Sequence, residues 1–143
     1  MSKAKILFLC TGNSCRSQMA EGWARVLKND LLEPYSAGVA PSKLDPRAVA
    51  VMREAGVDIS PQVPTHVSDL LDTDFDFVVT VCNHANETCP VFPGPVRRIH
   101  RNFDDPPKLA KTAKTPDEAL DHYRRVRDEI KAFVQTLPES LEE

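Results

Sequence analysis

The chain has 143 residues, of which 41% are hydrophobic and 27% are charged. This composition excludes a disordered or fibrous protein, and the length suits one hydrophobic core. The formal net charge of −3 argues against a nucleic-acid-binding groove, which needs Lys and Arg concentrated on one face. We therefore expect one domain over residues 1–143, with no nucleic-acid partner.

The cellular compartment decides how the four cysteines are interpreted. The apolar run near the N-terminus, residues 6–10, is shorter than a signal-peptide core or a membrane span. We therefore expect a cytoplasmic protein without a membrane partner, in which permanent disulfides are disfavoured. Three roles are therefore compatible with the four cysteines, which can be free thiols, metal ligands or redox catalysts. These cysteines are Cys10, Cys15, Cys82 and Cys89.

The N-terminal half predicts a strand followed by two helices. Residues 6–9 are typical of a buried strand, and residues 11–14 break it sharply. Residues 17–28 carry apolar side chains at three- and four-residue spacing, which predicts a helix packed on a sheet. Asp45 and Pro46 begin a second helix, which Gly56 ends.

The C-terminal half predicts two further strands and a long helix. Residues 77–81 are mostly β-branched and predict a buried strand that ends at Cys82, and residues 97–103 predict another. A capping box beginning at Thr115 predicts a helix to about Thr136. Residues 106–116 are rich in Pro and Lys and are expected to form a solvated loop.

Alternation of strands and helices predicts the α/β fold class. We expect a single three-layer domain with a central parallel sheet of about four strands, flanked by helices and joined by right-handed crossovers.

The segment from Cys10 to Arg16 has the spacing C-x5-R at the expected carboxyl end of the first strand. Ligands of open α/β sheets bind at such ends, beside helix N-termini. Successive N–H groups of the loop can surround an oxyanion that Arg16 clamps, with the Cys10 sulfur facing the central atom. The same groups favour the thiolate of Cys10. The expected oxyanion-binding residues are Thr11, Gly12, Asn13, Ser14, Cys15, Arg16 and Ser17.

Structural interpretations of these residues stay open at this stage. The C-x5-R spacing is weak by itself, and Cys10 and Arg16 can also be a buried strand-end thiol and a surface charge. Cys15 fits the role of a small loop residue. The cysteine spacings lack a C-x2-C pair and fit structural zinc badly, so no metal site is expected.

Residues 10–23 resemble the opening of thioredoxin-coupled arsenate reductases, which share the fold of low-molecular-weight protein tyrosine phosphatases. The resemblance continues through residues 35–38, 78–82, 89–90, 103–106 and 125–130. It implies that Cys10 is the nucleophile, Arg16 the oxyanion clamp and Asp105 the general acid. It further implies that Cys82 and Cys89 are the second and third redox cysteines.

The same resemblance implies partners and ligands. Arsenate is the expected substrate, with phosphate or sulfate as mimics, in arsenical resistance. Thioredoxin is the expected electron donor, with no tightly bound cofactor, although glutaredoxin or a small thiol stays open. Some relatives hold a potassium ion near the loop, and Asn13, Glu21, Ser36 and Asp69 match parts of that site. Residues 61–67 depart from the pattern, so no ion is assigned.

Two features favour a reductase over a phosphatase. Reduction of As(V) to As(III) needs two electrons, which Cys82 and Cys89 can supply by forming a disulfide. Pro107 stands where the phosphatases that this chain resembles carry a Tyr. If residues 82–89 are helical, their ends lie roughly 10 Å apart, beyond the ~7 Å limit for a disulfide. Disulfide formation is therefore expected to reshape residues 82–96.

The sequence thus predicts a monomeric enzyme that reduces arsenate to arsenite by a three-cysteine relay. A phosphomonoester hydrolase of the same fold is one alternative, and weak phosphatase activity is expected even from the reductase. A non-catalytic oxyanion-binding redox module is the other alternative.

Overall fold

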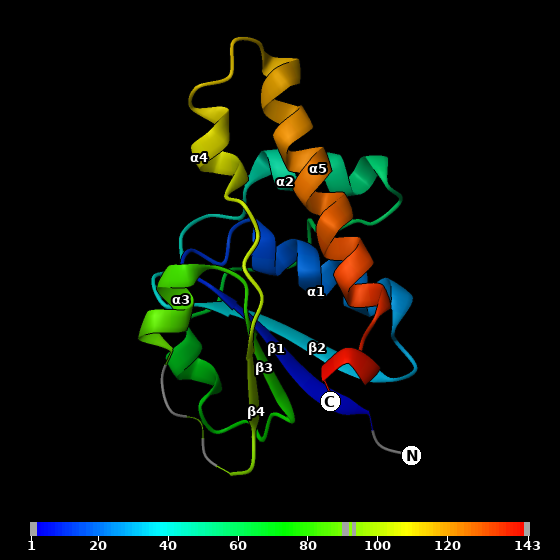
Figure 1. Cartoon of the computed structure of the whole chain (residues 1–143), viewed down its shortest axis with the longest axis vertical. Coiled ribbons are helices and arrows are strands. Elements are labelled where there is room, and N and C mark those ends of the chain that lie inside the picture. The colour runs from blue at the N-terminus through cyan, green and yellow to red at the C-terminus, as the bar shows by residue number, and fades with distance from the viewer. Residues whose placement is uncertain (1–2, 90–91, 93, 142–143) are drawn as a thin grey trace.

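A four-stranded parallel sheet forms the centre of the molecule (Figure 1). The computed structural model describes residues 3–89, 92 and 94–141. Its strands are β1 (Ala4–Cys10), β2 (Leu32–Gly38), β3 (Phe77–Thr80) and β4 (Arg97–His100), arranged in the order β2-β1-β3-β4. Every neighbouring pair is parallel, which confirms the predicted fold class.

Helices cover both faces of this sheet. They are α1 (Arg16–Leu27), α2 (Pro46–Glu54), α3 (Asn83–Thr88), α4 (Pro106–Ala110) and α5 (Pro116–Gln135), with short 3-10 turns η1 (Val67–Leu70) and η2 (Glu139–Leu141). Figure 1 shows α1 and α5 packed together on one side of the sheet, with α3 on the other. Among the described residues, no helix is long and apolar enough to cross a bilayer.

The predicted helix starts are confirmed by their capping hydrogen bonds. At α2, Asp45 accepts from the Arg47 N–H at 2.9 Å, and Gly56 follows the helix with a φ of +87°. At α5, Thr115 accepts from the Glu118 N–H at 3.0 Å. These side chains satisfy N–H groups that the first helical turn leaves without partners.

Three elements differ from the sequence-based predictions. The strand β2 was missed, because Pro34 removes a backbone donor, which a strand at the sheet edge tolerates. The strand β4 lies at the other edge and ends at His100, short of the predicted residue 103. The expected loop at residues 106–116 begins with the helix α4, whose first residue, Pro106, suits a helix N-terminus.

The two central strands bring the site together. Residues 6–9 of β1 are fully buried in one continuous hydrophobic cluster that also includes β3. Leu9 pairs with Thr80, and the Val81 N–H donates to the Leu9 carbonyl at 2.9 Å. Cys10 and Cys82 follow these positions, so the register places the two cysteines side by side at the carboxyl edge of the sheet.

Candidate active site

A cavity of about 460 Å³ opens over the loop between β1 and α1. Its lining comprises Cys10, Thr11, Gly12, Ser14, Cys15, Arg16, Asp105 and Pro107. Of the seven expected oxyanion-binding residues, Asn13 and Ser17 do not line it. Both are fully buried behind the loop, where the Asn13 amide donates to the Ser17 hydroxyl at 2.8 Å. These two side chains hold the loop in shape.

The segment 39–45, which follows β2, fixes the direction of the loop peptides. Four of its backbone N–H groups donate to loop carbonyls. The pairs, donor first, are Val39 to Cys10 (3.2 Å), Ala40 to Thr11 (2.8 Å), Ser42 to Gly12 (2.9 Å) and Asp45 to Ser14 (2.9 Å). In a trans peptide the N–H points opposite to the C=O. Carbonyls tied outward therefore turn the following N–H groups toward the cavity, where an anion would bind.

Gly38 allows this close approach of the loop to β2. A Cβ atom at this position would lie 2.6 Å from the Thr11 carbonyl oxygen and 2.9 Å from the Asn13 nitrogen. Both contacts are with backbone atoms, which cannot rotate away as a side chain would. A glycine at the end of β2 is therefore needed for the loop to keep its position.

Arg16 is held at the cavity wall by two partners. Its guanidinium donates to the Phe103 carbonyl at 2.9 Å and lies 3.7 Å from the Asp105 carboxylate. Arg16 is 9% exposed, whereas the Asp105 side chain is 42% exposed. Asp105 precedes α4 without capping it, so its carboxylate faces Arg16 and the cavity. This places a cation and a potential proton donor on one wall.

Cys10 and Cys82 form a buried, hydrogen-bonded pair of free thiols. This hydrogen bond and burial raise the pKa of Cys10 well above its usual value, and Arg16 only partly opposes them. The same hydrogen bond lowers the pKa of Cys82 to about 5. The hydrogen bond between the two sulfurs therefore favours the shared proton on Cys10 and the negative charge on Cys82. Arg16 and the Thr11 N–H act in the opposite direction on Cys10, so a Cys10 thiolate in the oxyanion-bound loop stays a prediction.

Two further groups stabilise the Cys82 thiolate. The Thr11 hydroxyl lies 3.2 Å from its sulfur, and the Ala85 N–H donates to it at 3.4 Å. Cys82 stands at the N-cap of α3, so the first turn of this helix supplies that N–H. Thr11 was predicted only as an oxyanion-binding residue. Its contact with Cys82 was not predicted, because the two residues are 71 positions apart.

Cys89 lies at the opposite end of α3, where it is half-buried. Burial raises its pKa, with a smaller opposing effect of Arg98, so Cys89 rests as a thiol. Six helical residues separate it from Cys82, so the two ends lie roughly 10 Å apart. A disulfide between them therefore requires α3 to unwind. Pro90, Val91 and Pro93, which belong to the segment expected to reshape, lie outside the described residues.

Cys15 keeps its proton within the loop. It is 4% exposed, and burial followed by the nearby Asp45 carboxylate raises its pKa well above the usual value. A buried neutral thiol is a poor nucleophile. Its geometry therefore fits the small loop residue proposed from the sequence, although the side chain also lines the cavity.

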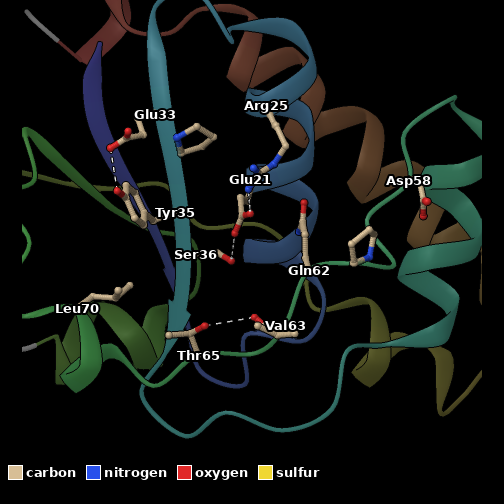
Figure 2. A pocket seen from close by; sticks show the side chains of 12 residues that line it. Glu21, Arg25, Glu33, Tyr35, Ser36, Asp58, Gln62, Val63, Thr65 and Leu70 are labelled. Atoms are coloured by element: carbon tan, nitrogen blue, oxygen red, sulfur yellow. Dashed lines mark hydrogen bonds and ion pairs between the residues drawn. The ribbon is translucent and has the colours of Figure 1, made fainter. Parts of the chain in front are cut away.

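A second cleft lies between α1, β2 and the segment after α2 (Figure 2). Here the Glu21 carboxylate is ion-paired with Arg25 and accepts from the Ser36 hydroxyl at 2.6 Å. The Arg25 guanidinium supplies the positive charge next to Glu21. Among the described residues, no group of three or more His, Cys, Asp or Glu side chains is placed to hold a metal ion. We assign no ion to this cleft.

The fold and the cysteine-arginine loop define a class of protein. The chain belongs to the low molecular weight phosphotyrosine protein phosphatase family, whose family model matches residues 5–143. This membership confirms the family resemblance drawn from the sequence.

Within this family, the chain is similar to arsenate reductases. One from Bacillus licheniformis is 49% identical over 95% of this chain and 99% of the relative. The structure of an arsenate reductase in its phosphate-binding state is 31% identical, with a TM-score of 0.72 over 96% of this chain and 98% of that one. A low molecular weight protein tyrosine phosphatase from T. tengcongensis is 26% identical, with a TM-score of 0.74 over 97% and 100% of the two chains.

Proposed function

We propose that this protein is an arsenate reductase that uses Cys10, Cys82 and Cys89 in succession and receives its electrons from thioredoxin. The neighbouring positions of Cys10 and Cys82 at the carboxyl edge of the sheet, with Cys10 lining the loop cavity and the Thr11 hydroxyl of that loop 3.2 Å from the Cys82 sulfur, carry the proposal. A phosphatase needs one thiol at this position, whereas a reductase needs a second sulfur within reach of the first. The likeness to arsenate reductases supports the same conclusion.

The first step is attack on arsenate by the Cys10 sulfur. Movement of the shared proton from Cys10 to the Cys82 thiolate supplies the Cys10 thiolate, whose sulfur forms a bond to arsenic. Arg16 and the loop N–H groups hold the negative charge of the oxyanion. Asp105 protonates the oxygen that leaves as water. The product is a covalent Cys10–arsenate adduct, with arsenic still As(V).

The second and third steps move two electrons from sulfur to arsenic. Cys82, once deprotonated again, attacks the Cys10 sulfur, and the electron pair of the sulfur–arsenic bond leaves with arsenic as arsenite. Cys89 then attacks Cys82 and releases the Cys10 thiolate, which leaves a Cys82–Cys89 disulfide. The dithiol of thioredoxin reduces this disulfide and is itself oxidised. One arsenate is thereby reduced for each disulfide formed.

The test is turnover of arsenate with thioredoxin, thioredoxin reductase and NADPH. Wild-type protein should consume NADPH and release arsenite, and Cys10→Ser, Cys82→Ser and Cys89→Ser should each lose multiple turnover. Cys89→Ser should still release about one arsenite per chain, because Cys10 and Cys82 complete the first two-electron transfer. Equal multiple turnover by Cys82→Ser would contradict the relay.

Phosphomonoester hydrolysis is the second candidate, favoured by the family and by Cys10, Arg16 and Asp105 around one cavity. It predicts efficient turnover of aryl phosphates that survives replacement of Cys82 and Cys89. Pro107 lines the cavity, and a proline ring cannot supply the flat aromatic wall that a phosphotyrosine ring would stack against. We therefore expect weak phosphatase activity beside arsenate reduction. A non-catalytic redox module would instead form the Cys82–Cys89 disulfide with peroxide but release no arsenite.

We further propose that the protein acts as a monomer in the cytoplasm. All three cysteines of the proposed relay belong to one chain, so the proposed reaction needs no residue of a second copy. A sedimentation experiment on the reduced protein measures the oligomeric state directly.

A further inference from the structure

Asn13 has a left-handed backbone conformation in the oxyanion loop. Its φ of +48° lies in the left-handed region, which costs a residue other than glycine on the order of 1 kcal/mol or more. The residue is fully buried, and its side chain is fixed at both ends. The amide nitrogen donates to Ser17, and the amide oxygen accepts from the Thr65 N–H at 2.8 Å. These contacts fix the side chain of Asn13, but they do not involve its backbone carbonyl.

The Asn13 carbonyl is held differently from its neighbours in the loop. The carbonyls of residues 10, 11, 12, 14 and 15 accept from backbone N–H groups of residues 39, 40, 42, 45 and 19. The Asn13 carbonyl accepts instead from the side-chain amide of Gln18, at 2.9 Å. The direction of the peptide between Asn13 and Ser14 therefore depends on one side chain.

Gln18 is in turn oriented by Gln62. Gln18 is fully buried, and its amide oxygen accepts from the Gln62 amide at 2.7 Å. The same Gln62 nitrogen lies 3.0 Å from the Gln18 backbone oxygen. A flipped Gln18 amide would place its oxygen against the Asn13 oxygen and its nitrogen against the Gln62 donor. Gln62 therefore selects the amide orientation that lets Gln18 donate to the loop.

Gln62 reaches this position from the second cleft, whose lining includes none of the four cysteines. Figure 2 shows it on the cleft wall, with the Glu21 and Thr65 side chains nearby. The segment 62–65 therefore meets the loop twice, through Gln62 and Gln18 and through the Thr65 N–H on Asn13. None of these residues contacts the cavity above Cys10.

We propose that Gln18 and Gln62 are positioning residues of the oxyanion site. Gln62 fixes the amide of Gln18, and Gln18 turns the peptide after Asn13 so that the Ser14 N–H faces the bound oxyanion. The trans peptide links the two directions, because its C=O and N–H are opposed. The inference rests on the proposed function only in requiring that the loop binds a tetrahedral oxyanion, so it applies to phosphate as well as arsenate.

The experiment is calorimetric titration of the reduced, full-length protein with inorganic phosphate. Gln18→Met keeps the length and burial of the side chain but removes its donor, and should weaken phosphate binding about tenfold. Gln62→Ala keeps Gln18 but removes the donor that orients its amide, and should weaken phosphate binding about threefold. Val63→Ala is the matched control, because Val63 is adjacent in sequence and 69% exposed. Its affinity should equal that of the wild type.

The double variant distinguishes a relay from two separate effects. If Gln62 acts through Gln18, adding Gln62→Ala to Gln18→Met produces no further loss of phosphate affinity. A further threefold loss would overturn the relay, and unchanged affinity in Gln18→Met would overturn the role of both residues. Should Gln18→Met fail to fold, the comparison of Gln62→Ala with Val63→Ala decides, and equal phosphate affinities overturn the proposal.

Arsenate kinetics provide a readout that general destabilisation does not produce. Both single variants should raise KM for arsenate in proportion to the phosphate dissociation constant, with a smaller change in kcat. A fall in kcat at unchanged KM would contradict positioning of the oxyanion. Because the titration needs no turnover, a wild-type protein that binds phosphate but fails to reduce arsenate would refute the proposed function alone.

Discussion

The two halves of the candidate site differ in how they are held. The loop between β1 and α1 is tied by backbone donors from the segment 39–45 and by buried side chains behind it. The six-residue helix α3 instead joins Cys82 and Cys89, which have to come together in the proposed relay. Binding of an oxyanion requires fixed donors, whereas passage of a disulfide along the chain requires movement. We expect substitutions in the loop to change affinity and substitutions in α3 to change the rate of later steps.

Among substitutions in the loop between β1 and α1 and its supports, Arg16→Lys should have the largest effect on activity. Lysine keeps the positive charge but loses the planar fork that can hold two oxygens and the Phe103 carbonyl together. We expect kcat/KM for arsenate to fall by about 10²- to 10³-fold, as for loss of a donor that stabilises transition-state charge. Steady-state kinetics measure this loss. If kcat/KM falls by less than about threefold, the loop N–H groups alone suffice to bind the oxyanion.

Gly38→Ala should displace the loop between β1 and α1, although Gly38 contacts none of the reacting atoms. The added Cβ would meet the backbone of Thr11 and Asn13 at less than 3.0 Å, so the loop must shift. We expect a loss of stability of about 1–3 kcal/mol together with weaker phosphate binding. Thermal unfolding and phosphate titration measure the two effects.

Gly22→Ala is the matched control for this substitution. Its Cβ would lie 2.5 Å from the Ile59 side chain, within the packing of α1 and away from the oxyanion cavity. It should therefore lose stability while the folded protein keeps its phosphate affinity. Equal losses of affinity in both variants would show that the close approach at Gly38 does not position the loop.

These contacts show which parts of the site can be predicted from sequence. Cys10, Arg16 and the loop between them were found because strand, turn and helix follow one another within about 25 residues. The neighbouring position of Cys82 follows from the parallel pairing of β1 with β3. The α/β pattern predicts a parallel sheet but not this strand order. Local pattern and resemblance therefore identified the sulfurs that the proposed relay uses.

Long-range partners were not predictable in this way. Nothing in the local pattern around Gln62 indicates that it meets Gln18, because that contact depends on the path of the chain between α2 and η1. The opposite directions in which Cys10 and Cys82 shift each other's pKa were also not predicted, since they depend on contact between residues 72 positions apart. Local helix and strand rules contain no information on either point.

At the boundary between the loop and α3, Thr11→Val should make the Cys82 thiolate less stable. The Thr11 hydroxyl stabilises the Cys82 thiolate, whose pKa is lowered to about 5. The thiolate is present above that pH and is lost as the pH falls through it. Removing the hydroxyl should raise the pKa of Cys82 by about one unit and move the loss of thiolate to higher pH. Ultraviolet absorbance of the thiolate against pH measures the midpoint.

Thr11→Ser serves as the control for the pKa, because it keeps the hydroxyl and loses only the methyl group. Its midpoint should match that of the wild type. If Thr11→Val also leaves the midpoint in place, the Cys10 hydrogen bond and the Ala85 N–H suffice to hold the thiolate.

The smallest predicted effect concerns α3, the helix that has to unwind in the proposed relay. Ala85→Gly lowers the helix propensity of α3 by about 1 kcal/mol, because glycine loses more backbone freedom on becoming helical. Unwinding of α3 precedes the Cys82–Cys89 bond, so the variant should form this disulfide about threefold to fivefold faster after the first arsenite is released. Rapid acid quench and thiol labelling measure that rate. Affinity for phosphate should not change, because Ala85 lies outside the loop and its cavity. A slower step would mean instead that attack by Cys89 depends on an intact helix that presents Cys82 in a fixed direction.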